Sequence, residues 1–393
     1  MTDALLVFNA GSSSLRGAIY ARDTLDVLAR VHVDAIGSEH QNAAWSGPLA
    51  THFRRASITT GSHAGAIAAI LDAVASGEPS LKITGAGHRV VHGGRRFAAP
   101  ARIDADVMAE IGRLTPLAPN HQPHNLAAIR AVASAWPQLA QVACFDTAFH
   151  RTQAPLEQRF ALPCSLHDAG IQRYGFHGLS YDYLAGELAK VAGARADGRV
   201  ILAHLGHGAS LCALRERRSV ATTMGFSALD GLMMGTRCGA IDPGVLLYLL
   251  DSARLDLATL SDVLYNRSGL LGVSGLSDDL RVLEASDDTP AVDAIEMFAD
   301  AVARHACALA CALGGLDSFV FSAGIGEHSA AMRARIVDKL GWLGAVLDAQ
   351  ANTERRAQIS AADSPIGIYV IPTDEELVIA RGTRACLDQI ATS

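Results

Sequence analysis

The sequence predicts an α/β protein with two domains, and three observations support this prediction. The chain has 393 residues, more than one hydrophobic core usually supports. Short apolar segments at 5–9, 200–204 and 318–322 each run into a Gly/Ser loop, as buried strands do. Helical patterns lie between such segments, one from about Ser180 to Gly193 and a longer one from Thr289 to about Gly314.

Composition narrows the class of protein. Half of the residues are apolar and 19% are charged, which fits a folded globular chain and excludes a disordered one. The formal net charge of −7 argues against nucleic acid or an anionic membrane as a partner. The start of the chain lacks a basic n-region, and no apolar stretch approaches the roughly 18 residues that span a bilayer, so a cytoplasmic location is expected. Seven cysteines without regular spacing fit reduced, buried thiols.

Two stretches repeat one pattern. Residues 5–20 and 200–214 both read as strand, Gly/Ser turn and strand, which suggests a duplicated domain whose turns point N–H groups and hydroxyls at phosphate. The first turn, 9–14, suits a polyphosphate or its magnesium shell, although it is not a Walker A motif because no GK[ST] follows. An ordinary polar hairpin with a Gly-rich turn remains the alternative.

Two later stretches have the composition of ligand sites. Gly324 and Gly326 follow an apolar strand and permit close approach of a nucleotide, but the third glycine of a dinucleotide fingerprint is missing. Asp374, Glu375 and Glu376 stand where a strand gives way to a helix. They are either partners of the helix dipole or oxygen ligands for Mg²⁺.

Two arginines stand among apolar residues and glycines. Arg89 precedes Gly93 and Gly94, and Arg237 lies between Gly235 and Gly239. A half-buried arginine needs an anion, which is either an internal carboxylate or a ligand carboxylate or phosphate. Histidines are numerous, but their spacing lacks the glutamate of HExxH, so zinc is not expected.

Taken together, these stretches resemble the acetate kinase family. The match runs in order along nearly the whole chain, through the motifs NAGSSSLR, GHRVVHGG, FDTAFH, YGFHGLS, HLGHGAS, MGTRCGAIDP, GLSDDLR, AGIGEHS and PTDEELVIA. The resemblance implies duplicated ribonuclease-H-like domains around a central nucleotide cleft, as in sugar kinases, actin and heat-shock ATPases. By the same resemblance, the first domain takes 1–145 and the returning helix 375–393. The second, 146–374, holds the nucleotide site and the interface of a homodimer.

The resemblance also implies the activity, which is reversible transfer of the γ-phosphoryl group of ATP to acetate, giving acetyl phosphate and ADP. ATP and ADP are then substrates, and Mg²⁺ is the cofactor, with Mn²⁺ as the alternative. The implied catalytic residues are Asp146, Arg89, Arg237 and His177. Those implied to bind the acid are Arg89, Val91, Asn120, His121, Phe176 and Ala228. Those implied to bind the nucleotide are Ser12, Ser14, Arg16, His204, Gly206, His207, Gly208, Asp279, Leu280, Arg281, Gly324, Ile325, Gly326, Glu327 and His328. The implied metal ligands are Asn9 and Glu375.

Physical chemistry supports these implied roles. A carboxylic acid with a pKa near that of Glu, about 4.3, is already ionised at neutral pH, so transfer needs no strong base. The barrier is the approach of one anion to another, which Arg89, Arg237, His177 and Mg²⁺ lower by supplying positive charge. We therefore expect direct transfer without a phosphoenzyme, and we expect Asp146 to orient the metal or an arginine.

Several positions depart from the family pattern. Arg16 replaces a lysine, and His207 and His328 replace asparagines, which bears on nucleotide affinity. In the acid pocket, Asn120 replaces a leucine and Ala228 a proline, so propionate or another short-chain acid is an alternative substrate. Two other classes stay in view. A sugar kinase should lack the paired arginines, and an actin-like ATPase would hydrolyse ATP without an acid substrate.

Overall fold

The computed structural model describes residues 2–11, 14–38, 41–53 and 61–391, and side chains up to residue 389. The chain divides into two compact units, Met1–Phe149 with Asp374–Ser393, and His150–Thr373. The first boundary lies four residues after the expected one and the second lies one residue before it, so Asp146 and Asp374 both belong to the first unit.

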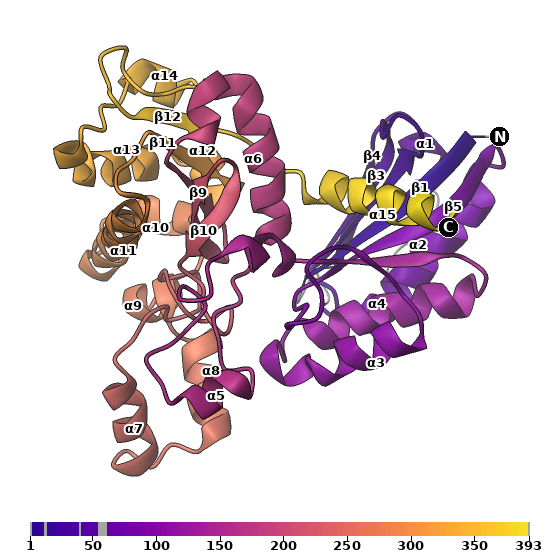
Figure 1. Cartoon of the computed structure of the whole chain (residues 1–393), viewed down its shortest axis with the longest axis horizontal. Helices are drawn as coiled ribbons and strands as arrows, with labels where there is room; N and C mark the ends of the chain where they lie inside the picture. Colours follow the sequence, from indigo (N-terminus) through magenta and orange to yellow (C-terminus); the bar gives the residue numbers. More distant parts are fainter. Residues whose placement is uncertain (1, 12–13, 39–40, 54–60, 392–393) are drawn as a thin grey trace. The chain divides into compact units, whose positions relative to one another are not determined.

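The first unit contains a seven-stranded sheet with the order β4-β3-β2-β1-β5-β7-β6 (Figure 1). Its strands are β1 (Thr2–Ala10), β2 (Leu15–Ala21), β3 (Val27–Asp34), β4 (Asn42–Ser46), β5 (Leu81–Val90), β6 (Ala101–Arg102) and β7 (Gln141–Phe145). Strands β1 to β4 are antiparallel neighbours, whereas β1, β5 and β7 are parallel, so the carboxyl ends of these three meet at one edge.

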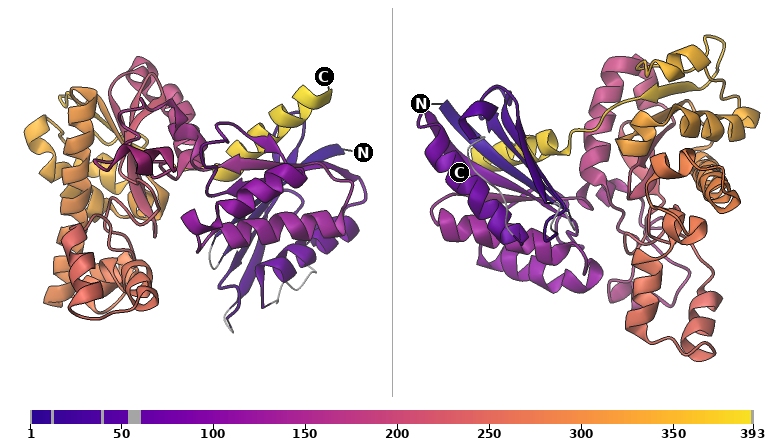
Figure 2. Two further views of the ribbon diagram at one scale, coloured as in Figure 1. Left: turned by 60° about the horizontal axis from the view of Figure 1, so that its bottom comes forward. Right: turned by 180° about the vertical axis from the view of Figure 1, so that it is seen from behind.

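Helices cover both faces of this sheet (Figures 1 and 2). They are α1 (Ala50–Phe53), α2 (His63–Gly77), α3 (Ala105–Arg113), α4 (Gln122–Ala135) and α15 (Glu375–Ala391), with 3-10 turns η1 (Thr115–Leu117) and η2 (Ala148–Thr152). On one face α15 lies so close to β5 that a Cβ at Gly85 would meet the Leu387 side chain at 2.4 Å. On the other face Ala86 joins the hydrophobic core built with α2 and α4.

The period-two alternation of the strands decides which residues share the α15 face. Gly85 and Gly87 of β5 contact α15, so Arg89 points to the same face. Leu5 packs near Gly85, which puts Asn9 on that face at the end of β1. The sheet thus places both polar residues at the start of α15.

The second unit repeats the arrangement with five strands in the order β10-β9-β8-β11-β12. They are β8 (Val200–Leu205), β9 (Ala209–Arg215), β10 (Arg218–Thr222), β11 (Ser318–Ser322) and β12 (Gly367–Val370). The order and directions match β3-β2-β1-β5-β7 of the first unit. The two hairpins with similar sequences are β1–β2 and β8–β9, which occupy equivalent places. The predicted duplication is therefore confirmed.

The second unit also contains helices and 3-10 turns (Figure 1). They are α5 (Cys164–Asp168), α6 (Gly178–Ala192), α7 (Pro243–Asp251), α8 (Leu257–Asn266), α9 (Gly269–Ser274), α10 (Leu280–Glu284), α11 (Thr289–Leu313), α12 (Ala323–His328), α13 (Ala330–Lys339), α14 (Ala349–Thr353), η3 (Gly193–Asp197) and η4 (Gly341–Leu343). The long helix is confirmed and ends at Gly314, whose φ of 71° closes it. Helix α6 begins two residues before Ser180.

Two expectations about single features need correction or comment. Only Cys144 and Cys212 are buried among the seven cysteines, whereas Cys164 and Cys311 are exposed, so the expectation of buried thiols is wrong for these two. All seven are free thiols, as expected. Within the part of the chain that the structure describes, none of the helices has the length and hydropathy needed to cross a membrane.

Three buried histidines make a prediction about acid stability. Burial lowers the pKa of His88, His92 and His150 to about 4. In the unfolded chain these side chains have a pKa of about 6.5, so below that pH the unfolded state binds more protons and stability falls as the pH drops toward 4. We expect His88→Leu and His150→Leu each to flatten the dependence of the free energy of unfolding on pH between 6.5 and 4. Urea unfolding at several pH values measures this slope, and a slope identical to wild type in both variants would contradict the prediction.

Candidate active site

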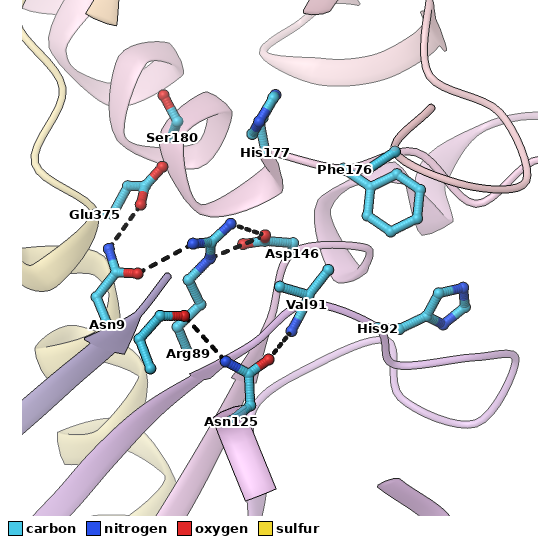
Figure 3. A network of polar contacts seen from close by, with 12 residues as sticks. Asn9, Arg89, Val91, His92, Asn125, Asp146, Phe176, His177, Ser180 and Glu375 are labelled. Atoms are coloured by element: carbon cyan, nitrogen blue, oxygen red, sulfur yellow. Dashed lines mark hydrogen bonds and ion pairs between the residues drawn. The ribbon is translucent and has the colours of Figure 1, made fainter. Parts of the chain in front are cut away.

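Four polar side chains meet in the first unit, where β1, β5 and β7 end and α15 begins (Figure 3). They are Asn9, Arg89, Asp146 and Glu375. Asn9 and Arg89 are the penultimate residues of β1 and β5, Asp146 directly follows β7, and Glu375 begins α15. All four therefore lie at the same edge of the sheet. Carboxyl ends of parallel strands are the usual place for a ligand site in an α/β fold.

Arg89 is the centre of this cluster. Its Nε and one terminal nitrogen donate to Asp146 Oδ2 at 3.0 and 2.7 Å, and its other terminal nitrogen donates to Asn9 Oδ1 at 3.1 Å. Burial alone would lower the pKa of Arg89, but Asp146 and Glu375 outweigh it and raise that pKa above its usual value. The guanidinium is therefore charged and fixed in direction on two sides.

Asp146 follows β7 and is completely buried. Burial raises its pKa to about 6, although the neighbouring Arg89 opposes the rise. Both bonds from Arg89 end on one carboxylate oxygen, and Oδ1 has no hydrogen-bond partner within the described parts of the chain. Asp146 therefore orients the Arg89 guanidinium through Oδ2, and its Oδ1 is available for another contact.

Asn9 connects β1 to α15. Its side-chain nitrogen donates to Glu375 Oε2 at 2.8 Å and to Glu376 Oε1 at 3.0 Å. Burial and the adjacent Glu375 raise the pKa of Glu376, and the charge of Arg16 lowers it. Arg16 is exposed and pairs with Asn9 across the β1–β2 hairpin, so the hairpin places it at the predicted phosphate turn.

The first turn itself is only partly described. Ser14 closes it by accepting a backbone bond from Gly11 at 2.9 Å, and Ser12 lies outside the described residues. The acidic residues of the C-terminal motif begin α15, as expected, with Glu375 and Glu376 in its first turn.

The donor atoms at this edge suit a hard cation. Asn9 Oδ1, the Glu375 carboxylate and the leftover Asp146 Oδ1 are all oxygens, and Asp146 Oδ1 is buried without a partner in the described structure. The described residues contain no group of three or more His, Cys, Asp or Glu that would hold a metal alone. A cation that keeps several waters and uses few protein ligands fits this set, which is the behaviour of Mg²⁺.

Val91 and its neighbours are positioned by side-chain amides that the sequence analysis did not single out. Asn125 of α4 accepts from the Val91 N–H at 3.0 Å and donates to the Ala10 carbonyl at 3.2 Å (Figure 3). The end of β5 is thereby tied to the end of β1. Of the other predicted acid-binding positions in this unit, Asn120 is exposed and His121 is half-buried.

His177 has an unusual backbone in the second unit. Its φ of 57° is left-handed, a conformation that is uncommon outside glycine, and it caps the start of α6 (Figure 3). Its Nδ1 contacts Ser210 Oγ at 2.8 Å, and its ring stacks on His204 at 4.3 Å between centroids. His204 in turn contacts Ser180 Oγ at 2.8 Å. The two predicted histidines therefore form one stacked pair.

His150 positions the segment that carries Phe176 and His177. Its Nε2 lies 2.9 Å from the Phe176 carbonyl, and its Nδ1 lies 2.9 Å from Ser219 Oγ. Because the low pKa leaves His150 neutral, Nε2 donates to the carbonyl and Nδ1 accepts from the hydroxyl. This fixes the segment that carries Phe176 and His177. His150 belongs to the FDTAFH motif, but no role had been assigned to it.

Arg237 approaches the turn between β8 and β9. A Cβ at Gly208 would stand 2.8 Å from an Arg237 terminal nitrogen and 3.4 Å from His177 Nε2, so glycine is needed there for both groups to come close. The other terminal nitrogen of Arg237 donates to the Ala228 carbonyl at 2.7 Å. The loop that carries Arg237 is joined to the same turn by a bond from Gly235 N–H to the His207 carbonyl at 3.1 Å.

A cavity of about 500 Å³ lies next to this turn in the second unit. Its lining comes from the β8–β9 turn, α10 and α12, namely Gly206, His207, Asp278, Asp279, Leu280, Arg281, Glu284, Gly324, Ile325, His328 and Ser329. Eight of these were predicted to bind a nucleotide, and Asp278, Glu284 and Ser329 were not. The volume is that of a small-molecule pocket. Residues 323–328, expected as a loop before a helix, form the short helix α12.

Several residues that line this cavity make polar side-chain contacts. His207 Nε2 lies 3.1 Å from Asp278, and Arg281 pairs with Asp279 at 2.6 Å. His328 Nδ1 lies 3.0 Å from a terminal nitrogen of Arg355, which donates to it. Since Arg355 cannot accept, His328 keeps its own ring proton on Nε2. The two histidines that replace asparagines thus each have a partner outside the predicted set.

The profile of the Acetokinase family matches residues 4–381. The chain belongs to the acetokinase family. Among its relatives, an acetate kinase of Rhodopseudomonas palustris strain TIE-1 is 48% identical over 388 residues, covering 97% of this chain and 98% of the relative. An acetate kinase of Methylocella silvestris is 44% identical over 404 residues and covers all of both chains.

Solved structures agree with this family membership. The crystal structure of an acetate kinase from Porphyromonas gingivalis aligns with a TM-score of 0.84 at 33% identity, over 98% of this chain and 100% of that one. A propionate kinase from Francisella tularensis aligns with a TM-score of 0.85 at 33% identity, over 98% and 99%. The predicted ribonuclease-H-like fold, present twice in this acetokinase-family chain, is confirmed.

The Arg89 cluster makes a prediction about stability. Arg89→Met removes both bonds to Asp146 and leaves a buried carboxylate without its cation, so we expect a loss of about 3–5 kcal/mol in the free energy of unfolding at neutral pH. Replacing Asp146 as well, in the double variant with Asp146→Asn, should recover part of this loss because no charge stays buried. Arg96→Met, which breaks an exposed pair with Asp106, serves as the control and should change little. Urea unfolding of wild type, the single variants Arg89→Met and Asp146→Asn, the double variant and the Arg96→Met control measures the effects. Strictly additive losses in the double variant would contradict the coupling.

Proposed function

We propose that this protein is an acetate kinase that transfers the γ-phosphoryl group of ATP to acetate and forms acetyl phosphate and ADP in a reversible reaction. The observation that carries the proposal is the match to the acetokinase family over residues 4–381. Curated relatives that are 44–48% identical over essentially the full chain are named acetate kinases. The site geometry adds cations and oxygen donors of the kind that this reaction needs.

The nucleotide site belongs to the second unit in this proposal. The adenosine moiety occupies the cavity between α10 and α12, against Leu280 and Ile325. The phosphates extend toward the turn from His204 to Ser210, where Arg237 and the paired histidines supply positive charge and hydrogen-bond donors. Support for this placement comes from the cavity volume and from the residues that the family motifs assign to it.

In this proposal, positioned cationic and hydrogen-bonding side chains promote phosphoryl transfer. Acetate arrives already ionised, so its carboxylate attacks the γ-phosphorus without a base, and ADP leaves directly. Arg89, Arg237 and His177 stabilise the charge on the equatorial oxygens, and they are held for this by Asp146, the Ala228 carbonyl and Ser210 respectively. Asp146 is a positioning residue, because both of its bonds orient the Arg89 guanidinium.

We assign Mg²⁺ as the divalent cation, with Mn²⁺ as the alternative. Asn9 and Glu375 would hold it, and the buried Asp146 Oδ1 is an additional oxygen at the same edge. When bound, the cation neutralises phosphate charge. Asn9 Oδ1 accepts a hydrogen bond from Arg89, so the Asn9 side chain would serve both the Arg89 guanidinium and the cation.

Acetate is the proposed acid, and propionate is the second candidate. Propionate remains a candidate because the chain is structurally similar to a propionate kinase. Of the two departures from the family, Asn120 is exposed and Ala228 holds Arg237 through its carbonyl, a role that does not depend on the side chain. One methylene in such a pocket changes specificity by about 1–3 kcal/mol, so both acids are expected to react.

The activity is tested with a hydroxamate assay containing ATP, Mg²⁺ and one of acetate, propionate, butyrate or glycerol. We expect acyl phosphate with acetate, a propionate kcat/KM within about a hundredfold of acetate, and no product with glycerol. Arg89→Lys should lower kcat by about a hundredfold or more, because one ammonium cannot contact both Asp146 and Asn9. Acid-independent ATP hydrolysis would contradict the proposal in favour of an actin-like ATPase.

A homodimer is part of the proposal, and helix α7 supports it. Its sequence PGVLLYLLD is apolar on all sides, yet none of its residues is buried. Helices of that composition are normally covered. Val245, Leu247, Tyr248 and Leu250 form an apolar surface, which we call the α7 surface, and Leu247 and Tyr248 are 69% and 63% exposed. A second copy of the chain would cover it, as family members usually pair through their second domain.

The dimer is tested by changing the α7 surface. Leu247→Glu places a charge in the proposed contact and should convert the dimer into a monomer. Light scattering after gel filtration measures the mass of each protein. Trp342→Glu is the matched control, because Trp342 is 74% exposed and lies in η4, away from α7 in the sequence. A monomeric wild-type protein, or a Leu247→Glu protein that stays dimeric at micromolar concentration, would contradict this interface.

A cytoplasmic location completes the proposal. Seven free thiols, two of them exposed, fit a reducing compartment. Small-molecule substrates, rather than nucleic acid or a membrane, are the partners that the net charge of −7 favours.

A further inference from the structure

Among the residues that the structure describes, Arg333 of α13 is the largest fully buried side chain. None of the ion pairs found among the described residues includes it. Burial and, to a smaller extent, the charge of Arg355 lower the pKa of its guanidinium. A buried charge without a counter-ion is costly unless hydrogen bonds replace its hydration. Its partners therefore show what it is for.

Four hydrogen bonds hold the Arg333 guanidinium, and all end on neutral oxygens. One terminal nitrogen donates to the carbonyls of Gly326 and Glu327, both at 2.9 Å. Nε donates to Asn352 Oδ1 at 2.7 Å, and the remaining nitrogen donates to the Asn352 carbonyl at 2.8 Å. Arg333 thus connects α12 to Asn352 in α14.

Helix α12 needs such support for a physical reason. It has only six residues, Ala323–His328, and the side chain of its N-cap Ser322 makes no hydrogen bond to any residue that the structure describes. A helix this short is not stable by itself, and its last carbonyls have no partners inside the helix. The Ile325 carbonyl is bonded by Ser329 N–H at 3.0 Å, and Arg333 bonds the next two. The positive charge of Arg333 near the C-terminal end of α12 also interacts favourably with the helix dipole.

The two carbonyls that Arg333 binds lie between cavity residues. Gly324, Ile325 and His328 of α12 line the cavity, and Gly326 and Glu327 are the residues between them. The Glu327 carboxylate ties the other end of the helix by accepting from the Ala323 N–H at 2.8 Å. Fixing the carbonyls of residues 326 and 327 therefore fixes where Ile325 and His328 stand in the cavity.

We propose that Arg333 is a positioning residue for nucleotide binding, which holds α12 in the shape that accepts the nucleotide. The inference rests on the proposed function for the identity of the ligand. Arginine is required because a single planar group reaches α12 and α14 at the same time, which a lysine ammonium cannot do. Asn352 is its partner, and its side-chain nitrogen donates to the Ala330 carbonyl at 2.9 Å, so α13 is tied in as well.

The test compares Arg333→Met with Arg335→Met. Arg335 lies in the same helix two residues on, but it forms a partly exposed pair with Glu296 at 2.9 Å. For Arg333→Met we expect the KM for ATP to rise about tenfold or more while the KM for acetate stays within about twofold, because the change affects nucleotide binding only. Arg335→Met should match wild type, and Arg333→Lys should lie between the two.

A second readout does not need activity. Hydrogen exchange of the amides at 323–329, measured without nucleotide, should be faster in Arg333→Met than in wild type and unchanged in Arg335→Met. If Arg333→Met does not fold, Arg333→Lys and Asn352→Ala give the same comparison.

Two results would overturn the positioning role. One is a KM for ATP within about twofold of wild type in the folded Arg333 variants, and the other is an equal rise in both KM values, which would indicate general damage. Failure of the proposed function is distinguishable, because wild type would then show no ATP-dependent acyl phosphate. In that case, faster hydrogen exchange at 323–329 in the Arg333 variants would still show that Arg333 stabilises α12. Unchanged exchange would show that it does not.

Discussion

The buried contact of Arg89 with Asp146 and Asn9 is the interaction on which the rest of the first unit depends. A guanidinium at the end of an apolar strand needs partners on both sides, and these partners come from β7 and β1, the strands that flank β5. The third side is closed by α15, whose Glu375 and Glu376 bind the Asn9 amide. The C-terminal helix must therefore return to the first sheet for the cluster to form, and the close packing at Gly85 and Gly87 allows it.

The second unit uses the same sheet in a different chemical way. Three of its groups have neutral hydrogen-bond partners, namely Ser210 for His177, the Ala228 carbonyl for Arg237, and backbone and amide oxygens for Arg333, whereas Arg281 pairs with the carboxylate of Asp279. A cation bound to a neutral acceptor keeps its net charge, which suits an anionic ligand. The first unit instead combines cation and carboxylates, which suits a site shared by an acid and a metal ion. One duplicated fold thus supports two kinds of binding surface.

Residues that we propose to contact the substrates through their own side chains could be recognised from the sequence, whereas the residues that position them could not. Arg89, His177 and Arg237 stand in ordered motifs with distinctive neighbours. Hydrogen bonds to distant backbone groups are what Asn125, His150 and Arg333 contribute. Asn125 and His150 bond carbonyls 115 and 26 residues away, and Arg333 bonds carbonyls of another helix. No local sequence pattern indicates such partners. The apolar segment 318–322 was expected to run into a Gly/Ser loop, but residues 323–328 form helix α12. Hydrogen bonds that Arg333 donates and that the Glu327 carboxylate accepts offset the low helix propensity of its two glycines.

The sequence by itself determined the α/β class, the duplicated hairpins, the long helix 289–313 and the family, because apolar periodicity and short motifs are local properties. The roles within the family pattern stay predictions. Only the tertiary structure decided that Asp146 belongs with the first unit and grips Arg89, that three side-chain contacts brace α12, and that Asn120 is exposed. The physical reason is that burial and hydrogen-bond partners depend on which distant segments the sheet order brings together, and a strand's sequence shows its faces but does not name its neighbours.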